Sequence, residues 1–91
     1  MAVTVRIPTQ LRPLAGGAAE LELEGATVAE VLRALDTAHP GFAERIFDDT
    51  GTLRRFVNVF VADEDIRFLD GVETPVAAGQ VVSIIPAVAG G

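Results

Sequence analysis

The sequence predicts an α+β domain in which one main helix packs on one face of a mixed sheet of four or five strands. Apolar and polar residues alternate in several short segments, as they do in half-buried strands. One longer segment instead repeats its apolar residues with the spacing of an amphipathic helix. The chain has 91 residues, of which 49% are hydrophobic. This is enough for one packed core and too little for a second domain.

The first two strands are expected at residues 2–8 and 19–25. In the first, every second residue is valine or isoleucine, and in the second leucine alternates with glutamate. Pro13 and the pair Gly16 and Gly17 lie between them and predict the turn of a hairpin. The aligned glutamates are expected to form a solvated face, because no loop of Asp or Asn ligands accompanies them to make a cation site.

The main helix is expected to begin after Thr27. Thr27 and Glu30 have the spacing of a capping box, in which each side chain accepts a hydrogen bond from the other residue's backbone amide. Apolar residues then recur at helical spacing until Pro40 and Gly41 end the helix. His39 lies at that end, where we expect a structural role because no second nitrogen or sulfur ligand for a metal is present. Residues 42–47 predict one more helical turn.

The second half of the chain predicts three further strands. Alternation in residues 56–61 directs three valines towards the helix and Phe56, Asn58 and Phe60 towards the opposite face. Residues 62–65 are expected to turn into a short strand at residues 66–68. The last strand, residues 81–85, is apolar on both faces and is therefore expected at the centre of the sheet.

One helix covers only one face of such a sheet, so part of the other face is expected to remain an exposed apolar patch. A patch of this kind usually marks a protein-binding surface. Phe56 and Phe60 are therefore candidate partner-binding residues.

The composition excludes several classes of function. The net charge is −6 and all seven basic residues are arginine, so an acidic chain without a basic cluster is not expected to bind nucleic acid. No apolar run is long enough to span a membrane, and the first residues do not form a signal peptide, so a cytoplasmic location is expected. The absence of cysteine excludes disulfides and thiolate metal sites.

The catalytic inventory is small, with Ser83 as the one serine and His39 as the one histidine. Ser83 lies within a predicted strand and lacks the glycines of a nucleophile elbow. The chain is therefore not expected to be an enzyme, and no residue is assigned a catalytic or a metal-binding role.

Residues 87–91 are expected to form a flexible tail that follows a globular domain of residues 1–86. The tail is narrow, since Val88 is its one bulky residue, and Val88 and Ala89 are further candidates for partner binding. Gly90 and Gly91 allow close approach of partner atoms to the backbone. The reactive group that such a tail offers is the α-carboxylate of Gly91.

The order of the elements and three motifs resemble the ThiS/MoaD family of ubiquitin-like β-grasp sulfur carriers, and within it the CysO-type branch. The motifs are "IPTQLRP" near the start, "RFVNVFVADEDIRF" in the middle and "SIIPAVAGG" at the end. The resemblance extends over essentially the whole chain and implies the β-grasp fold.

The resemblance also implies a mechanism. An E1-like enzyme adenylates the carboxylate of Gly91, next to Gly90, with ATP, and a sulfur source converts it into a thiocarboxylate. For the CysO type, that sulfur attacks an aminoacrylate on a PLP-dependent cysteine synthase, and a zinc-dependent JAMM/MPN-type peptidase releases cysteine. The ATP, PLP and zinc belong to these partners, and none is expected to bind this chain stably.

Other readings remain open at this point. The sulfur acceptor can differ, for example in a thiosugar pathway. The chain can also be a MoaD-like small subunit of molybdopterin synthase, a ubiquitin-like protein modifier, or an interaction module with an inert tail.

Overall fold

The computed structural model describes residues 2–50, 53–54 and 57–86, and within them a five-stranded sheet. The strands are β1 (Ala2–Arg6), β2 (Glu20–Glu24), β3 (Val57–Val61), β4 (Glu64–Asp65) and β5 (Val81–Pro86). Their order in the sheet is β2-β1-β5-β3-β4. The β1–β5 pair is parallel and every other pair is antiparallel, so the sheet is mixed, as predicted.

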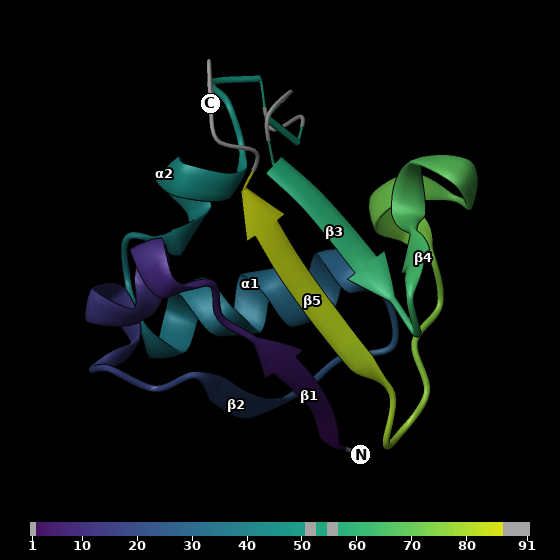
Figure 1. Ribbon diagram of the computed structural model, residues 1–91. Coiled ribbons are helices and arrows are strands. Elements are labelled where there is room, and N and C mark those ends of the chain that lie inside the picture. Colours follow the sequence, from purple (N-terminus) through teal and green to yellow (C-terminus); the bar gives the residue numbers. More distant parts are fainter. Residues whose placement is uncertain (1, 51–52, 55–56, 87–91) are drawn as a thin grey trace.

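Helix α1 (Val28–Ala38) crosses one face of this sheet, and the short helix α2 (Phe42–Ile46) follows it (Figure 1). Three 3-10 helices connect the other elements: η1 (Thr9–Ala15), η2 (Ile66–Phe68) and η3 (Gly71–Glu73). The predicted α+β class, with one main helix on a mixed sheet, is confirmed.

The core lies between α1 and the sheet face that α1 covers. The inward residues of β1, β3 and β5 are all at most 5% exposed, as are the valines and leucines of α1. They are Val3, Val5, Val57, Val59, Val61, Val82, Ile84, Val28, Val31, Leu32 and Leu35. The alternation in the strands and the helical spacing in α1 therefore identified the buried residues correctly.

The N-terminus of α1 is capped nearly as the capping box predicts. The Thr27 hydroxyl accepts a hydrogen bond from the backbone N–H of Glu30 at 3.3 Å. The Glu30 carboxylate accepts from the backbone N–H of Ala26 at 3.1 Å, one residue before the expected N-cap amide. Both side chains therefore satisfy backbone donors at the point where the chain enters the helix.

Replacing Thr27 with Ala is expected to lower the free energy of unfolding by about 1 kcal/mol, because the Glu30 amide loses its acceptor. Urea denaturation measures this change. Thr37 is the matched control, since its hydroxyl donates to the carbonyl of Arg33 within α1 and caps nothing. Thr37→Ala is expected to leave stability nearly unchanged. Equal effects of the two substitutions would contradict the capping role.

One predicted local structure forms with a difference, and another is wrong. The β1–β2 hairpin forms, but its connection is the 3-10 helix η1 rather than a simple turn, because Leu11 and Ala15 are buried in the core. Residues 66–68 are also a 3-10 helix rather than a strand. The Asp65 carboxylate accepts from the backbone N–H of Arg67 at 2.8 Å, which begins η2, and Ile66 is fully buried. The short strand β4 precedes it.

Helix α2 is tied to α1 by one carboxylate. Asp36 accepts hydrogen bonds from the backbone N–H groups of Gly41 at 3.2 Å and Ala43 at 2.9 Å. Gly41 has a φ of +112°, a conformation that favours glycine. The bonds hold the first turn of α2 against the end of α1, and they direct Phe42 and Ile46 into the core.

Candidate functional site

Strand β5 carries the candidate site, because it leads towards the glycine pair at residues 90 and 91. It pairs with β1 from Val81 to Ser83 and with β3 from Val82 to Pro86, so it lies at the centre of the sheet, as predicted (Figure 1). The last residues themselves, including Val88, Ala89, Gly90 and Gly91, lie outside the described part of the chain. Their predicted roles stay predictions.

The sheet face opposite α1 bears Phe60, one of the predicted partner-binding residues; we call it the open face. Phe60 is half-buried there and is paired with Ser83, while Asn58 is paired with Ile85. Ile85 is 49% exposed. Apolar surface therefore remains on this face next to the end of β5, as predicted. Phe56, the other predicted residue, lies outside the described residues.

Arg67 supports the strand beside the end of β5, a role that the sequence did not reveal. Its guanidinium donates to the backbone carbonyl of Val57 at 2.7 Å and to that of Arg54 at 3.1 Å, and it also donates to the side-chain oxygen of Asn58. Val57 is paired with Pro86. Arg67 therefore holds the start of β3 where β3 pairs with the last residue of β5. The spacing of residues in the sequence could not reveal this contact, because it depends on where η2 places Arg67 relative to β3.

A hollow of about 360 Å³ lies at the carboxyl end of β5; we call it the terminal notch. It forms because the β1–β5 pairing ends at Arg6 and Ser83, whereas β5 continues to Pro86 beside β3. The chain after β1 turns away into η1. The residues that line the notch are Arg6, Ile7, Pro8, Thr9, Gln10, Arg12, Ser83, Ile84 and Ile85.

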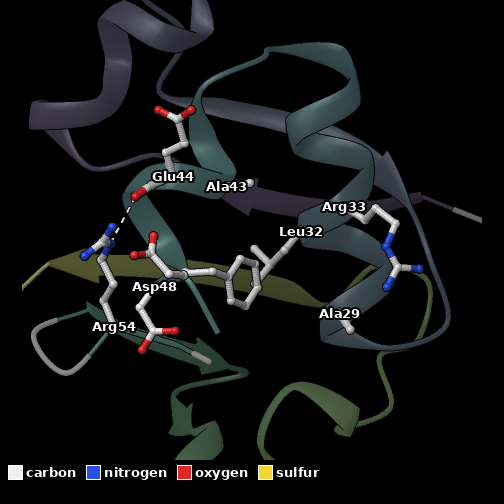
Figure 2. Close-up of a pocket in the computed structure, with 9 residues that line it drawn as sticks. Ala29, Leu32, Arg33, Ala43, Glu44, Asp48 and Arg54 are labelled. Atoms are coloured by element: carbon white, nitrogen blue, oxygen red, sulfur yellow. Dashed lines mark hydrogen bonds between the residues drawn. The ribbon is translucent and has the colours of Figure 1, made fainter. Parts of the chain in front are cut away.

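A second hollow, of about 500 Å³, lies on the helical side of the molecule. Figure 2 shows Glu44 and Arg54 on one side of it and Ala29 and Arg33 on the other. The Arg54 Nε–H donates to the Glu44 backbone carbonyl at 3.0 Å, the dashed line in the figure. None of the residues lining this hollow belongs to β5 or to the open face.

Among residues 2–50, 53–54 and 57–86, no group of three or more acidic or histidine side chains could hold a metal ion. No helix in the same part of the chain is both long and apolar enough to cross a membrane.

Comparison with known proteins gives a consistent result. A model of the ThiS family matches residues 5–91. The chain is 47% identical to the sulfur carrier protein CysO of Mycobacterium tuberculosis, over 100% of both chains. It superposes with a TM-score of 0.93 on the CysO in the crystal structure of the Amycolatopsis orientalis BexX/CysO complex, with 47% identity and coverage of 99% of this chain and 100% of that one. It is also 40% identical to small archaeal modifier protein 3 of Haloferax volcanii, over 75% of this chain and 73% of that protein.

Proposed function

The chain belongs to the ThiS family, with the ubiquitin-like β-grasp fold, and we propose that it is a sulfur carrier whose reactive group is the α-carboxylate of Gly91. The observation that carries the proposal is the 47% identity to the sulfur carrier CysO over the whole of both chains. The centrally placed β5 supports it, since this strand connects a rigid sheet to the residues that bear the carboxylate.

The proposed chemistry has two steps. A carboxylate oxygen of Gly91 attacks the α-phosphorus of ATP on an E1-like enzyme, which forms an acyl-adenylate and releases pyrophosphate. A sulfur nucleophile then attacks the acyl carbon and AMP leaves, which produces a thiocarboxylate. Glycine at positions 90 and 91 suits both attacks, because no side chain shields the acyl carbon. The chain itself is the co-substrate in this scheme and not the enzyme.

The proposed sulfur acceptor follows from the likeness to CysO. The thiocarboxylate donates its sulfur to a PLP-dependent cysteine synthase, or to another enzyme that makes a thio-metabolite, and a JAMM/MPN-type zinc peptidase releases the product. ATP, PLP and zinc are held by these partner enzymes in the proposal, and the chain acts with them in the cytoplasm. The solved complex of a CysO with BexX is a precedent for a carrier of this kind bound to another protein.

The intact mass of the protein isolated from its own cells tests the proposal. A species heavier by one oxygen-to-sulfur exchange, located at Gly91 by fragmentation, is expected, and an added cysteine residue would identify the pathway. Isolation must avoid strong nucleophiles, which attack the acyl carbon and displace the sulfur. The proposal fails if only the carboxylate is found, even after incubation with ATP, sulfide and the host's E1-like enzyme.

The similarity to a small archaeal modifier protein favours a second candidate function, the modification of other proteins. In that case Gly91 would form isopeptide bonds with lysines of target proteins after the same activation. The chain has no lysine of its own, so it could not form branched chains through itself. Tryptic peptides of cellular proteins that carry a lysine-linked C-terminal remnant of this chain would establish the modifier function.

The open face is the proposed docking surface for the activating enzyme, and Phe60 tests this role. Phe60→Asp is expected to raise the KM for the carrier in adenylation about tenfold, because a charge replaces an apolar contact. Stability is expected to change much less, since Phe60 is only half-buried. Ala38→Asp is the control: it adds the same charge at an exposed position on α1 and is expected to leave KM unchanged. If Phe60→Asp unfolds the protein, Phe60 belongs to the core instead.

A further inference from the structure

The terminal notch has a charge opposite to that of the chain as a whole. The chain carries a net charge of −6. The notch is lined by two arginines, Arg6 and Arg12, and none of the described residues that line it is acidic. A negatively charged group is therefore attracted to this hollow beside the end of β5, even though the chain as a whole is acidic.

Arg12 is held so that its outer nitrogens are available to a ligand. Its Nε–H donates to the backbone carbonyl of Ile7 at 3.2 Å, and its side chain is half-buried. This bond fixes the plane of the guanidinium. Within the described residues, neither of its terminal amino groups has a hydrogen-bond partner. A guanidinium that is already oriented binds a carboxylate with two parallel hydrogen bonds and loses little side-chain entropy in doing so.

Arg6 lies beside Arg12, because both line the notch and also a neighbouring hollow of about 450 Å³. The Arg6 Nε is 3.3 Å from a carboxylate oxygen of Glu20, and its side chain is 63% exposed. An exposed pair of this kind contributes little stability. Arg6 can therefore exchange Glu20 for another carboxylate at small cost.

The notch is continuous with the apolar surface of the open face. Ile85 belongs to both: it lines the notch and is exposed beside Asn58. An apolar contact bordered by oriented charges is the usual arrangement at the centre and rim of a protein–protein interface. A protein that docks on Phe60 and Ile85 therefore comes within reach of Arg6 and Arg12.

We propose that the terminal notch binds an aspartate or glutamate side chain of the enzyme that activates Gly91, through Arg12 and Arg6. This inference rests on the proposed function, in which that enzyme docks on the open face. The arginine–carboxylate contacts set the orientation of docking, and so direct the residues after Pro86 towards the enzyme's nucleotide site. Charge pairs at an interface act mainly in this way, on the association rate and on the register.

The test is steady-state adenylation by the host's E1-like enzyme, measured by pyrophosphate release at varied carrier concentration. Arg12→Glu and Arg6→Glu are each expected to raise the KM for the carrier about fivefold to tenfold, with kcat nearly unchanged. The KM of Arg12→Lys is expected to lie between those of the wild type and Arg12→Glu. Lysine keeps the positive charge, but it cannot donate the two parallel hydrogen bonds of a guanidinium. Arg33→Glu is the matched control, since it makes the same charge change at an exposed position on α1 and should leave KM unchanged.

A second experiment identifies the carboxylate of the enzyme that binds in the notch. Individual acidic residues of the enzyme are replaced with arginine, and each enzyme variant is tested with the Arg12→Glu carrier. One of these replacements is expected to return the KM for this carrier towards the wild-type value, and it identifies the carboxylate that Arg12 binds. Circular dichroism verifies the fold of each variant. If Arg12→Glu fails to fold because it loses its bond to Ile7, the exposed Arg6→Glu still decides the question.

Other outcomes overturn the inference. An unchanged KM for the carrier in both glutamate variants would do so, and so would a rise in the KM for ATP alone, because the arginines would then bind the nucleotide's phosphates. These results leave the proposed function intact. The failure of the wild-type protein to be adenylated is a different result, which refutes the proposed function itself.

Discussion

Deleting Gly91 is expected to reduce adenylation and thiocarboxylation at least about a hundredfold, while the thermal unfolding midpoint stays that of the wild type. Removing one residue withdraws the carboxylate by about 3.5 Å, and a misplacement of even about 1 Å can cost this much rate. Strand β5 ends at Pro86, so the deletion removes no residue of the described sheet. Pyrophosphate release and intact mass measure the chemistry, and circular dichroism measures the unfolding midpoint.

Substitutions at Gly91 keep the tail at its full length. They therefore test whether a side chain obstructs the acyl carbon, separately from the position of the carboxylate. Gly91→Leu is expected to be inactive, because its side chain covers the acyl carbon that the sulfur nucleophile must attack. Gly91→Ala is expected to retain intermediate activity. Normal thiocarboxylation of the shortened protein would show that Gly91 does not bear the reactive group.

Phe42→Ala is expected to lower the free energy of unfolding by about 3 to 5 kcal/mol, the usual cost of removing a buried phenylalanine. Phe42 is the largest of the fully buried side chains in the described part of the chain. A domain of this size is stabilised by only about 5–15 kcal/mol, so this single change removes a large part of its stability. The urea denaturation midpoint measures the loss.

Phe68 is the matched control for this prediction, because it is the same residue type at 87% exposure. Phe68→Ala is expected to change stability by no more than about 0.5 kcal/mol. If Phe42→Ala were equally mild, α2 would not be part of the core, and the hydrogen bonds from Gly41 and Ala43 to Asp36 would be its main attachment.

The main elements of the fold could be predicted from the sequence because their signals are local and periodic. Alternation placed Val57, Val59 and Val61 on the covered face, and the spacing after Thr27 predicted α1. The run in residues 81–85, which has apolar residues on both faces, also predicted that β5 is central, and the sheet order confirms this position. The family resemblance is confirmed by the match to the ThiS model.

The connections could not be predicted in the same way, because tertiary contacts decide them. Residues 66–68 read as a strand from composition, yet Asp65 caps a 3-10 turn there that buries Ile66. Residues 9–15 contain a proline and precede two glycines, which is typical of a turn. They form a 3-10 helix because this conformation buries Leu11 and Ala15 in the core.

The candidate site was only partly accessible from the sequence. The open-face position of Phe60 followed from alternation along β3. The terminal notch did not, because it depends on where β1 stops relative to β5 and on the path of η1. Arg6 and Arg12 are six positions apart in the sequence and in different elements, so no motif unites them.

The central position of β5 has a mechanical consequence. A pull on the residues that follow Pro86 is directed along the axis of β5. Its hydrogen bonds to β1 and β3 run across that axis, so they are loaded together in shear and are not opened one after another. An edge strand such as β4 would peel away under a far smaller force. An enzyme that draws the chain's last residues into a narrow channel therefore meets a firm anchor, and the tension it applies is shared by three strands without unravelling the domain.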